Sequence, residues 1–136
     1  MAEKKSELQE AMPGPQAPPE LAGLHRIFTD GAGDGRMAWY NETTKESWSA
    51  KTHVSSNNEA EYLAIYNALN SANTKNIEIL SDSQLVVNQL KREWAIKSDR
   101  MRDMFDKVYY IIDLRGLQVT FTWIPREKNP AGKYLG

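Results

Sequence analysis

Three carboxylates stand where a folded chain could bring them together. Asp30 and Asp82 each end an apolar segment, and Glu61 lies in a segment with helical spacing. Acidic side chains that are packed together repel one another, and a divalent cation is the usual remedy. Oxygen ligands without a histidine or cysteine partner favour Mg²⁺ or Mn²⁺ over zinc. These residues therefore indicate a divalent-metal site.

Helical periodicity separates Glu61 from Glu59. Successive residues turn by about 100°, so Glu61 lines up with an apolar stripe that includes Ile65 and Leu69. Ser56 followed three residues later by Glu59 forms a capping box, which gives Glu59 a structural explanation. Glu61 has no such explanation, and a carboxylate on a core-facing stripe is costly unless something binds it. The simpler alternative is an ion pair with a lysine or arginine, or a place just beyond the core.

The two aspartates fit a sheet whose strands end at one edge. In open α/β sheets, sites form beyond the C-terminal ends of the strands. If the strands before Asp30 and Asp82 are parallel neighbours, the two carboxylates lie close together. The alternatives are a turn role for Asp30, which precedes Gly31, and an N-cap role for Asp82, which precedes a helical segment.

The elements that must position these residues alternate in type. Strand-like segments cover 23–30, 36–42, 45–51, 76–82 and 117–125, and helix-like segments cover 55–73, 83–94 and 99–116. This order predicts an α/β mixed sheet with helices on its faces. We expect both histidines, His25 and His53, to be surface or edge residues.

Composition bounds the class of protein. The 136 residues fit one domain, 40% of them are hydrophobic, and the formal net charge is −1. No apolar run approaches the roughly 20 residues of a membrane span, and the N-terminus lacks a signal-peptide core. The chain has no cysteine, which excludes disulfides, thiolate ligands and a cysteine nucleophile. We expect a cytoplasmic monomer with no membrane attachment and no obligate protein partner.

The N-terminal segment differs from the rest of the chain. Residues 1–20 begin with charged residues and carry four prolines between Pro13 and Pro19. Such a segment predicts a flexible arm. The packed domain is therefore expected over residues 21–136.

Four motifs, in this order, resemble type 1 ribonuclease H. They are FTDGAGDG, SSNNEAEY, ILSDSQLVVNQL and WIPREKN, and the match runs from about Leu24 to the last residue. The resemblance implies a five-stranded mixed sheet in the order 3-2-1-4-5, with strand 2 antiparallel to the rest and helices flanking the sheet. It also implies an endonuclease that hydrolyses the RNA strand of RNA–DNA hybrids and leaves 3′-hydroxyl and 5′-phosphate ends.

The resemblance assigns roles residue by residue. The catalytic and metal-binding acids correspond to Asp30, Glu61 and Asp82, which would hold two Mg²⁺ ions about 4 Å apart, with Mn²⁺ as the alternative metal. The family's asparagine pair and SDSQ glutamine read minor-groove edges and sugars, where 2′-hydroxyls identify RNA. The residues expected to bind the hybrid are Ser56, Asn57, Asn58, Gln84, Trp94 and Lys97.

One position departs from the family pattern. A fourth carboxylate normally follows an asparagine by four residues, but here Lys133 follows Asn129 at that spacing, and Arg126 lies in the loop where some relatives carry a histidine. Three carboxylates and one ammonium leave a charge of about −2, enough for one divalent ion. Four alternatives follow for Lys133: it weakens binding of the second metal ion, its ammonium partly replaces that ion, it contacts substrate phosphate, or it points to solvent. In the third case Glu127 or Asn129 would take the ligand role.

The departure leaves alternative functions open. We expect a slower enzyme that needs high Mg²⁺ or prefers Mn²⁺. The alternative is a catalytically weakened or inactive hybrid-binding module of the same fold. Another enzyme of the wider superfamily, such as an exonuclease or a transposase core, is disfavoured, because the pair Asn57–Asn58 and Gln84 serve recognition of the hybrid's minor groove.

Overall fold

A computed structural model describes residues 23–136, which form one mixed sheet in the order β3-β2-β1-β4-β5. The strand β2 runs antiparallel to β1 and β3, whereas β4 runs parallel to β1 and β5. The strands are β1 (Leu24–Gly31), β2 (Arg36–Asn41), β3 (Ser47–Lys51), β4 (Asn76–Ser81) and β5 (Gln118–Trp123). The expected strand order and directions are confirmed. The arm predicted over residues 1–20 lies outside the described residues.

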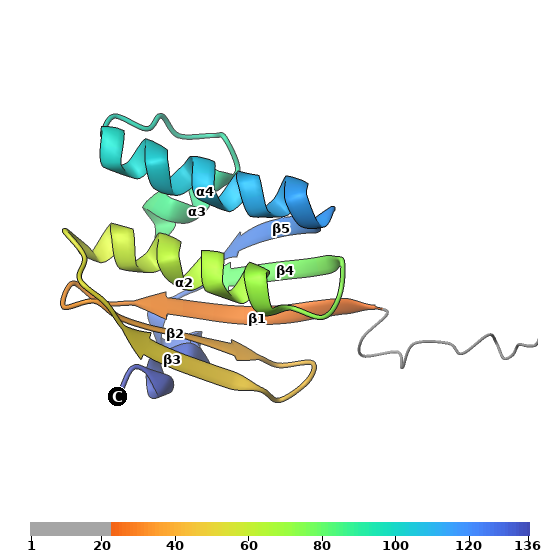
Figure 1. Cartoon of the computed structure of the whole chain (residues 1–136). Helices are drawn as coiled ribbons and strands as arrows, with labels where there is room; N and C mark the ends of the chain where they lie inside the picture. The colour runs from red at the N-terminus through yellow and green to blue at the C-terminus, as the bar shows by residue number, and fades with distance from the viewer. Residues whose placement is uncertain (1–22) are drawn as a thin grey trace, which may run out of the picture.

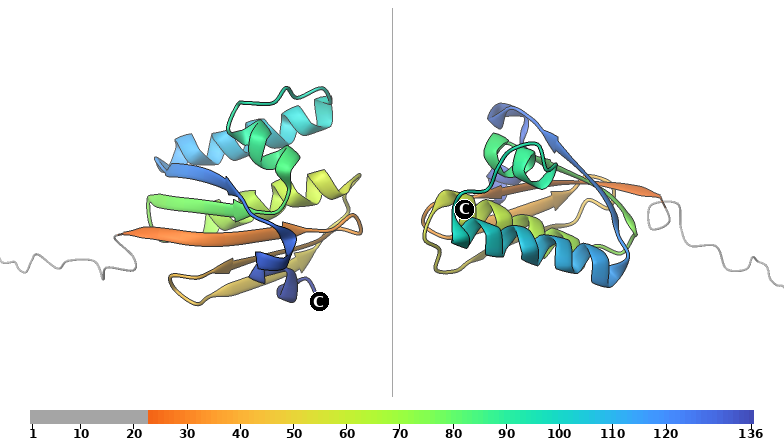
Figure 2. Two further views of the ribbon diagram at one scale, coloured as in Figure 1. Left: turned by 180° about the vertical axis from the view of Figure 1, so that it is seen from behind. Right: turned by 90° about the horizontal axis from the view of Figure 1, so that it is seen from above.

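Helices cover one face of this sheet, and the C-terminal segment lies against the other (Figures 1 and 2). The helices are α2 (Asn57–Ser71), α3 (Gln84–Leu90) and α4 (Asp99–Arg115), and two 3₁₀ turns follow, η2 (Arg126–Lys128) and η3 (Pro130–Tyr134). Among the described residues, no helix is long and apolar enough to cross a membrane.

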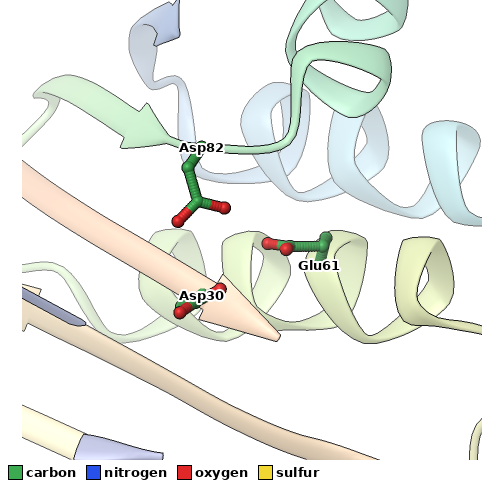
Figure 3. A group of neighbouring side chains, drawn as sticks. All are labelled: Asp30, Glu61 and Asp82. Carbon is green, nitrogen blue, oxygen red and sulfur yellow. The ribbon is translucent and has the colours of Figure 1, made fainter. Parts of the chain in front are cut away.

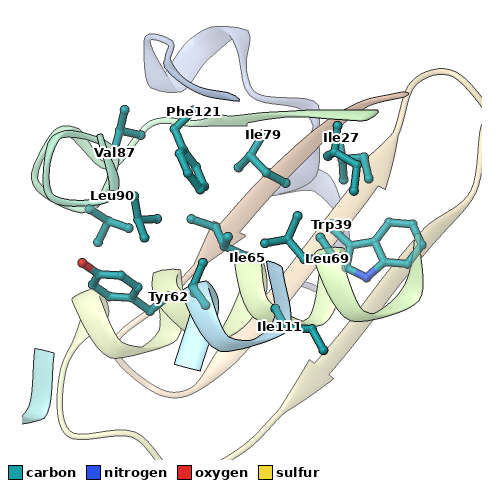
Figure 4. Packing of buried hydrophobic residues seen from close by; sticks show 14 of the residues in the cluster. Ile27, Trp39, Tyr62, Ile65, Leu69, Ile79, Val87, Leu90, Ile111 and Phe121 are labelled. Atoms are coloured by element: carbon teal, nitrogen blue, oxygen red, sulfur yellow. The ribbon is translucent and has the colours of Figure 1, made fainter. Parts of the chain in front are cut away.

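The main core lies between the sheet and the helices. Alternate residues of the strands, such as Ile27 and Ile79, meet Ile65 and Leu69 of α2, and all four are at most 1% exposed (Figure 4). A smaller cluster on the opposite face joins Phe28, Leu80 and Ala131. The buried alanine thereby anchors the 3₁₀ turns to the sheet.

The second predicted helix ends earlier than expected. The spacing predicted a helix over 83–94, but α3 stops at Leu90. Arg92 has a left-handed φ of 64°, and the carbonyl of Asn88 accepts hydrogen bonds from the N–H groups of Glu93 and Trp94. The chain therefore turns sharply, and Trp94 is placed in a loop before α4.

The expectation that His25 lies at the surface is wrong. Its side chain is fully buried, and its Nδ1 lies 3.1 Å from the Asn41 amide nitrogen. The carbonyl oxygen of the same amide accepts hydrogen bonds from the N–H groups of Thr43 and Thr44 in the β2–β3 turn. His25 is thus part of the support of a hairpin, whereas His53 is exposed.

Gly31 allows β1 to approach α2 closely. A Cβ atom on Gly31 would lie 2.5 Å from the carbonyl carbon of Ala60 and 2.6 Å from the nitrogen of Glu61. Both contacts are to backbone, which cannot rotate aside in a close-packed interior. The missing side chain therefore sets the distance between the end of β1 and the first turns of α2.

Replacing Gly31 with alanine is expected to lower the free energy of unfolding by about 1–3 kcal/mol, because the added methyl group overpacks this contact. Urea denaturation measures the effect. The matched control is Gly33→Ala, whose Cβ would have the side-chain oxygen of Asn57 as its nearest neighbour, at 2.9 Å, and no backbone atom from another part of the described chain closer than 3.9 Å. Equal losses in both variants would contradict this explanation.

Candidate metal-binding active site

Three elements bring the predicted acids together. Thr29 of β1 pairs with Ser81 of β4 in parallel register, so the next residues, Asp30 and Asp82, lie at the same edge of the sheet. Glu61 reaches them from α2 (Figure 3). One carboxylate oxygen from each of the three acids lies within 4.8 Å of the other two. The sheet register and the helix contact together create this acid cluster.

Glu61 is the most strongly perturbed acid. Its side chain is 6% exposed, and its Oε1 has no hydrogen-bond partner in the described part of the chain. Burial raises the pKa of Glu61 to about 9, the charges of Asp30 and Asp82 act in the same direction, and Arg126 opposes them. In the absence of a cation, Glu61 is therefore protonated at neutral pH.

Asp30 responds to the same surroundings. Burial first, and then the charge of Asp82, raises the pKa of Asp30, while the N–H of Gly31 and the charge of Arg126 lower it. The Gly31 N–H donates to Asp30 Oδ1 at 2.9 Å. Arg126 forms no ion pair with these acids in the described structure. Its guanidinium therefore remains free to bind another anion.

The C-terminal segment holds Asp82 in place. The amide nitrogen of Asn129 donates to Asp82 Oδ2 at 3.1 Å and to the Thr29 carbonyl at 2.9 Å. Its amide oxygen accepts from the Ala131 N–H and caps η3. Asn129 is thus the N-cap of this turn, and Pro130 follows it in the first turn. Because its amide oxygen caps this turn, Asn129 is suited to position Asp82 and not to bind a metal.

Lys133 lies in the turn that borders the acid cluster. A Cβ on the preceding residue, Gly132, would stand 3.3 Å from Asp30 Oδ2. The Lys133 side chain is exposed and lines a pocket with Phe28 and Tyr40 on the sheet face opposite the helices. The turn thus approaches Asp30 through Gly132, and Lys133 borders this neighbouring pocket.

Comparisons with known proteins identify the family. A family model described as reverse transcriptase-like matches residues 31–135. The chain belongs to this family. The match includes Glu61 and Asp82 and begins one residue after Asp30, and together with the solved structures below it confirms the resemblance to type 1 ribonuclease H.

Solved ribonuclease H structures share the fold. The RNase H1 of the halophilic archaeon Halobacterium salinarum NRC-1 is 26% identical, with a TM-score of 0.73 over 83% of this chain and 94% of that one. LC11-RNase H1, isolated from compost and solved in complex with an RNA/DNA hybrid, is 25% identical, with a TM-score of 0.69 over 82% of this chain and 99% of that one.

One curated relative is more similar in sequence. The uncharacterized protein YpeP of Bacillus subtilis (strain 168) is 31% identical over 115 residues, which cover 81% of this chain and 48% of YpeP. The chain therefore spans about half the length of this relative.

The predicted hybrid-binding residues of this ribonuclease H-like domain occupy neighbouring places. Asn58, Trp94 and Lys97 line one pocket of about 650 Å³ between α2 and the loop before α4. Gln84 is exposed at the start of α3, and Asn57 faces Gly33 in the loop after β1. The residue types expected to contact a nucleic acid thus continue from the acid cluster toward α4.

Ser56 and Glu59 have the structural roles that the capping pattern predicted, with one difference. The Ser56 hydroxyl oxygen accepts a hydrogen bond from the Glu59 N–H at 3.2 Å. The Glu59 carboxylate accepts from the N–H of Ser55, and not Ser56, at 2.7 Å and pairs with Arg100 at 3.3 Å. These contacts begin α2 at the place that brings Glu61 to the other acids.

The sequence did not predict the hydrogen bonds that support the pocket between α2 and the loop before α4. The Tyr62 hydroxyl donates to Gln89 Oε1 at 2.8 Å, and Gln89 Nε2 donates to the Ala95 carbonyl at 3.2 Å. These bonds tie α2, α3 and the Trp94 loop together. In the sequence, the only indication of this support was a glutamine on the apolar stripe of a short helix. The sequence does not show which residues this glutamine bonds.

The raised pKa of Glu61 predicts a pH-dependent stability. Without metal, the folded state holds a proton on Glu61 that the unfolded chain loses above its ordinary pKa of 4.5. The melting temperature of the metal-free protein should therefore fall as pH rises from about 5 to about 9. Glu61→Gln should flatten this slope, and Glu93→Gln, an exposed control, should not. Scanning calorimetry in EDTA checks this, and identical slopes in wild type and Glu61→Gln would contradict it.

Proposed function

We propose that this domain is a metal-dependent endonuclease that hydrolyses the RNA strand of RNA–DNA hybrids. The observation that carries the proposal is the cluster of Asp30, Glu61 and Asp82, whose oxygens converge within 4.8 Å. Binding a polyanion does not need three clustered anions, which would repel phosphate. A role in binding cations explains why the three carboxylates are clustered, because cations bound there attract and activate a phosphodiester.

The residues present fit Mg²⁺ or Mn²⁺. The donor set consists of carboxylate oxygens only, which suits hard divalent cations. Glu61 Oε1 is buried without a partner in the described chain, and such an oxygen is costly unless something binds it. When bound, the metal would supply a nucleophilic hydroxide and neutralise charge on the phosphate.

The chain's own residues would orient the reaction. Asn129 holds Asp82 with one oxygen turned toward its amide, which leaves the carboxylate's other oxygen for a ligand. Arg126 would attract the phosphate to the edge of the cluster, since its guanidinium has no carboxylate partner there. Asn57, Asn58 and Gln84 would contact the minor groove, where 2′-hydroxyls distinguish RNA from DNA.

A second function, a hybrid-binding module with little or no catalysis, is favoured by one observation. By its spacing from Asn129, Lys133 corresponds to the position where the resemblance implies a fourth acid. Loss of one anion lowers the capacity of the cluster for a second cation. Cleavage assays separate the two functions, because a pure binding module would leave a labelled hybrid intact at every metal concentration.

Asp30→Asn is expected to reduce cleavage of a labelled hybrid by roughly 10²-fold or more, because it removes one charged ligand from the cluster. Cleavage in Mg²⁺ and in Mn²⁺, beside duplex DNA and duplex RNA, measures activity and selectivity. Asp34→Asn is the matched control, since Asp34 is exposed and its ion pair in the described structure is with Arg36, the first residue of β2. Unchanged cleavage by Asp30→Asn would refute the proposed role of the cluster.

Lys133→Asp is expected to lower the Mg²⁺ concentration needed for half-maximal cleavage by roughly tenfold, because it restores an anion to the turn that touches Asp30. The assay uses saturating hybrid, so that changes in substrate affinity do not contribute. Lys133→Gln is the control that removes the ammonium without adding a carboxylate. If Lys133→Asp and Lys133→Gln have the same metal requirement, position 133 does not act on the metals.

A further inference from the structure

A second pocket, of about 460 Å³, lies on the sheet face opposite the helices. Its floor is aromatic, with Phe28 of β1 and Tyr40 of β2, and Tyr134 stacks on Tyr40 with ring centroids 5.7 Å apart. Its rim carries Lys45, Lys128 and Lys133. We call this site the lysine pocket.

The three lysines come from separate segments that the fold brings together. Lys45 lies in the β2–β3 turn with a left-handed φ of 70°, and its N–H bonds the Asn41 carbonyl at 2.8 Å. Lys128 ends η2, and Lys133 lies in η3. The Phe28–Leu80–Ala131 cluster fastens η3 against the sheet, so this convergence is built by packing. It does not reflect a basic chain, because the formal net charge is −1.

The lysines keep their charges available. Among residues 23–136, none of the three forms an ion pair, whereas Arg26, Arg36 and Arg100 do. Two acids border the pocket, Glu42 and Glu127. Glu42 is bound by Arg26 at 2.5 Å. Three ammonium groups therefore face one carboxylate that has no cation of its own in the described structure.

We propose that the lysine pocket binds a phosphate ester that carries a nucleoside. Lysine ammonium groups bind phosphate as point charges, without the planar fork that arginine offers to a carboxylate. Phe28 and Tyr40 provide an apolar surface for a base or sugar. The volume lies within the range of small-molecule sites. The phosphate comes either from the nucleic-acid strand beyond the acid cluster or from a free mononucleotide.

Asn129 connects the lysine pocket to the acid cluster. It lines the pocket, and its amide nitrogen donates to Asp82 on the other side of the chain. A strand that leaves the acids along the C-terminal turns would meet the three lysines next. Binding of a hybrid strand in the lysine pocket rests on the proposed function, whereas binding of a free mononucleotide does not.

The test uses the full chain and two titrants, adenosine 5′-monophosphate and inorganic phosphate, followed by chemical shifts in ¹⁵N-labelled protein. Wild type is expected to show saturable shifts at Lys45, Lys128 and Lys133. The double variant Lys45→Gln/Lys128→Gln should weaken binding at least tenfold. The matched double variant Lys75→Gln/Lys107→Gln removes the same charge elsewhere and should bind as wild type does. Anisotropy with a labelled hybrid in Ca²⁺, at several salt concentrations, identifies the source of the phosphate.

Each outcome decides the inference. A weaker hybrid affinity and a shallower salt dependence in the Lys45/Lys128 variant alone would support the strand as the source. Nucleotide binding that is lost in this variant, with hybrid affinity equal to the control, would support a free mononucleotide. Absence of saturable shifts in the pocket, or equal loss in both double variants, would overturn the inference. Failure of hybrid cleavage would count against the proposed function and leave the nucleotide result standing.

Discussion

The close approach of β1 to α2 is the constraint on which the rest of the structure depends. Gly31 has no side chain, so the backbone of α2 can lie against the end of the strand at Ala60 and Glu61. The apolar stripe of α2 fixes the helix on the sheet through Ile65 and Leu69. The packing of α2 thereby places Glu61 in a buried position beside two aspartates, although burial of its carboxylate is itself unfavourable.

The molecule offsets the resulting repulsion only in part. Protonation removes the charge of Glu61 while no cation is bound, the Asn129 amide holds Asp82, and the charge of Arg126 acts on both Asp30 and Glu61. One buried oxygen of Glu61 still has no partner among the described residues. Buried polar groups are almost always satisfied in native proteins. This oxygen of Glu61 therefore makes the cluster well suited to cations, and the half-buried Asp30 and Asp82 leave it accessible from solvent.

The C-terminal segment unites the two sites that the proposals concern. Its turns are held by Ala131 under the sheet and by the stacking of Tyr134 on Tyr40. One side of this segment positions Asp82, and the other side forms the rim of the lysine pocket. A short piece of irregular chain can serve both sites because it is packed against a rigid sheet, which keeps the two sets of side chains in fixed relation.

The sequence by itself determined the elements, the strand order through the family motifs, and the three acids, because periodicity and motif spacing are local properties of the chain. It predicted that Asp30 and Asp82 would meet, since parallel strands end at one edge. Only the tertiary structure decided where α3 stops, that His25 is buried, and that Lys45 joins Lys128 and Lys133 around one pocket. The burial of His25 and the lysine pocket arise from contacts between residues far apart in the chain, and such contacts leave no period or spacing in the sequence to read. The end of α3 depends on a left-handed backbone at Arg92, a residue type that does not signal this conformation.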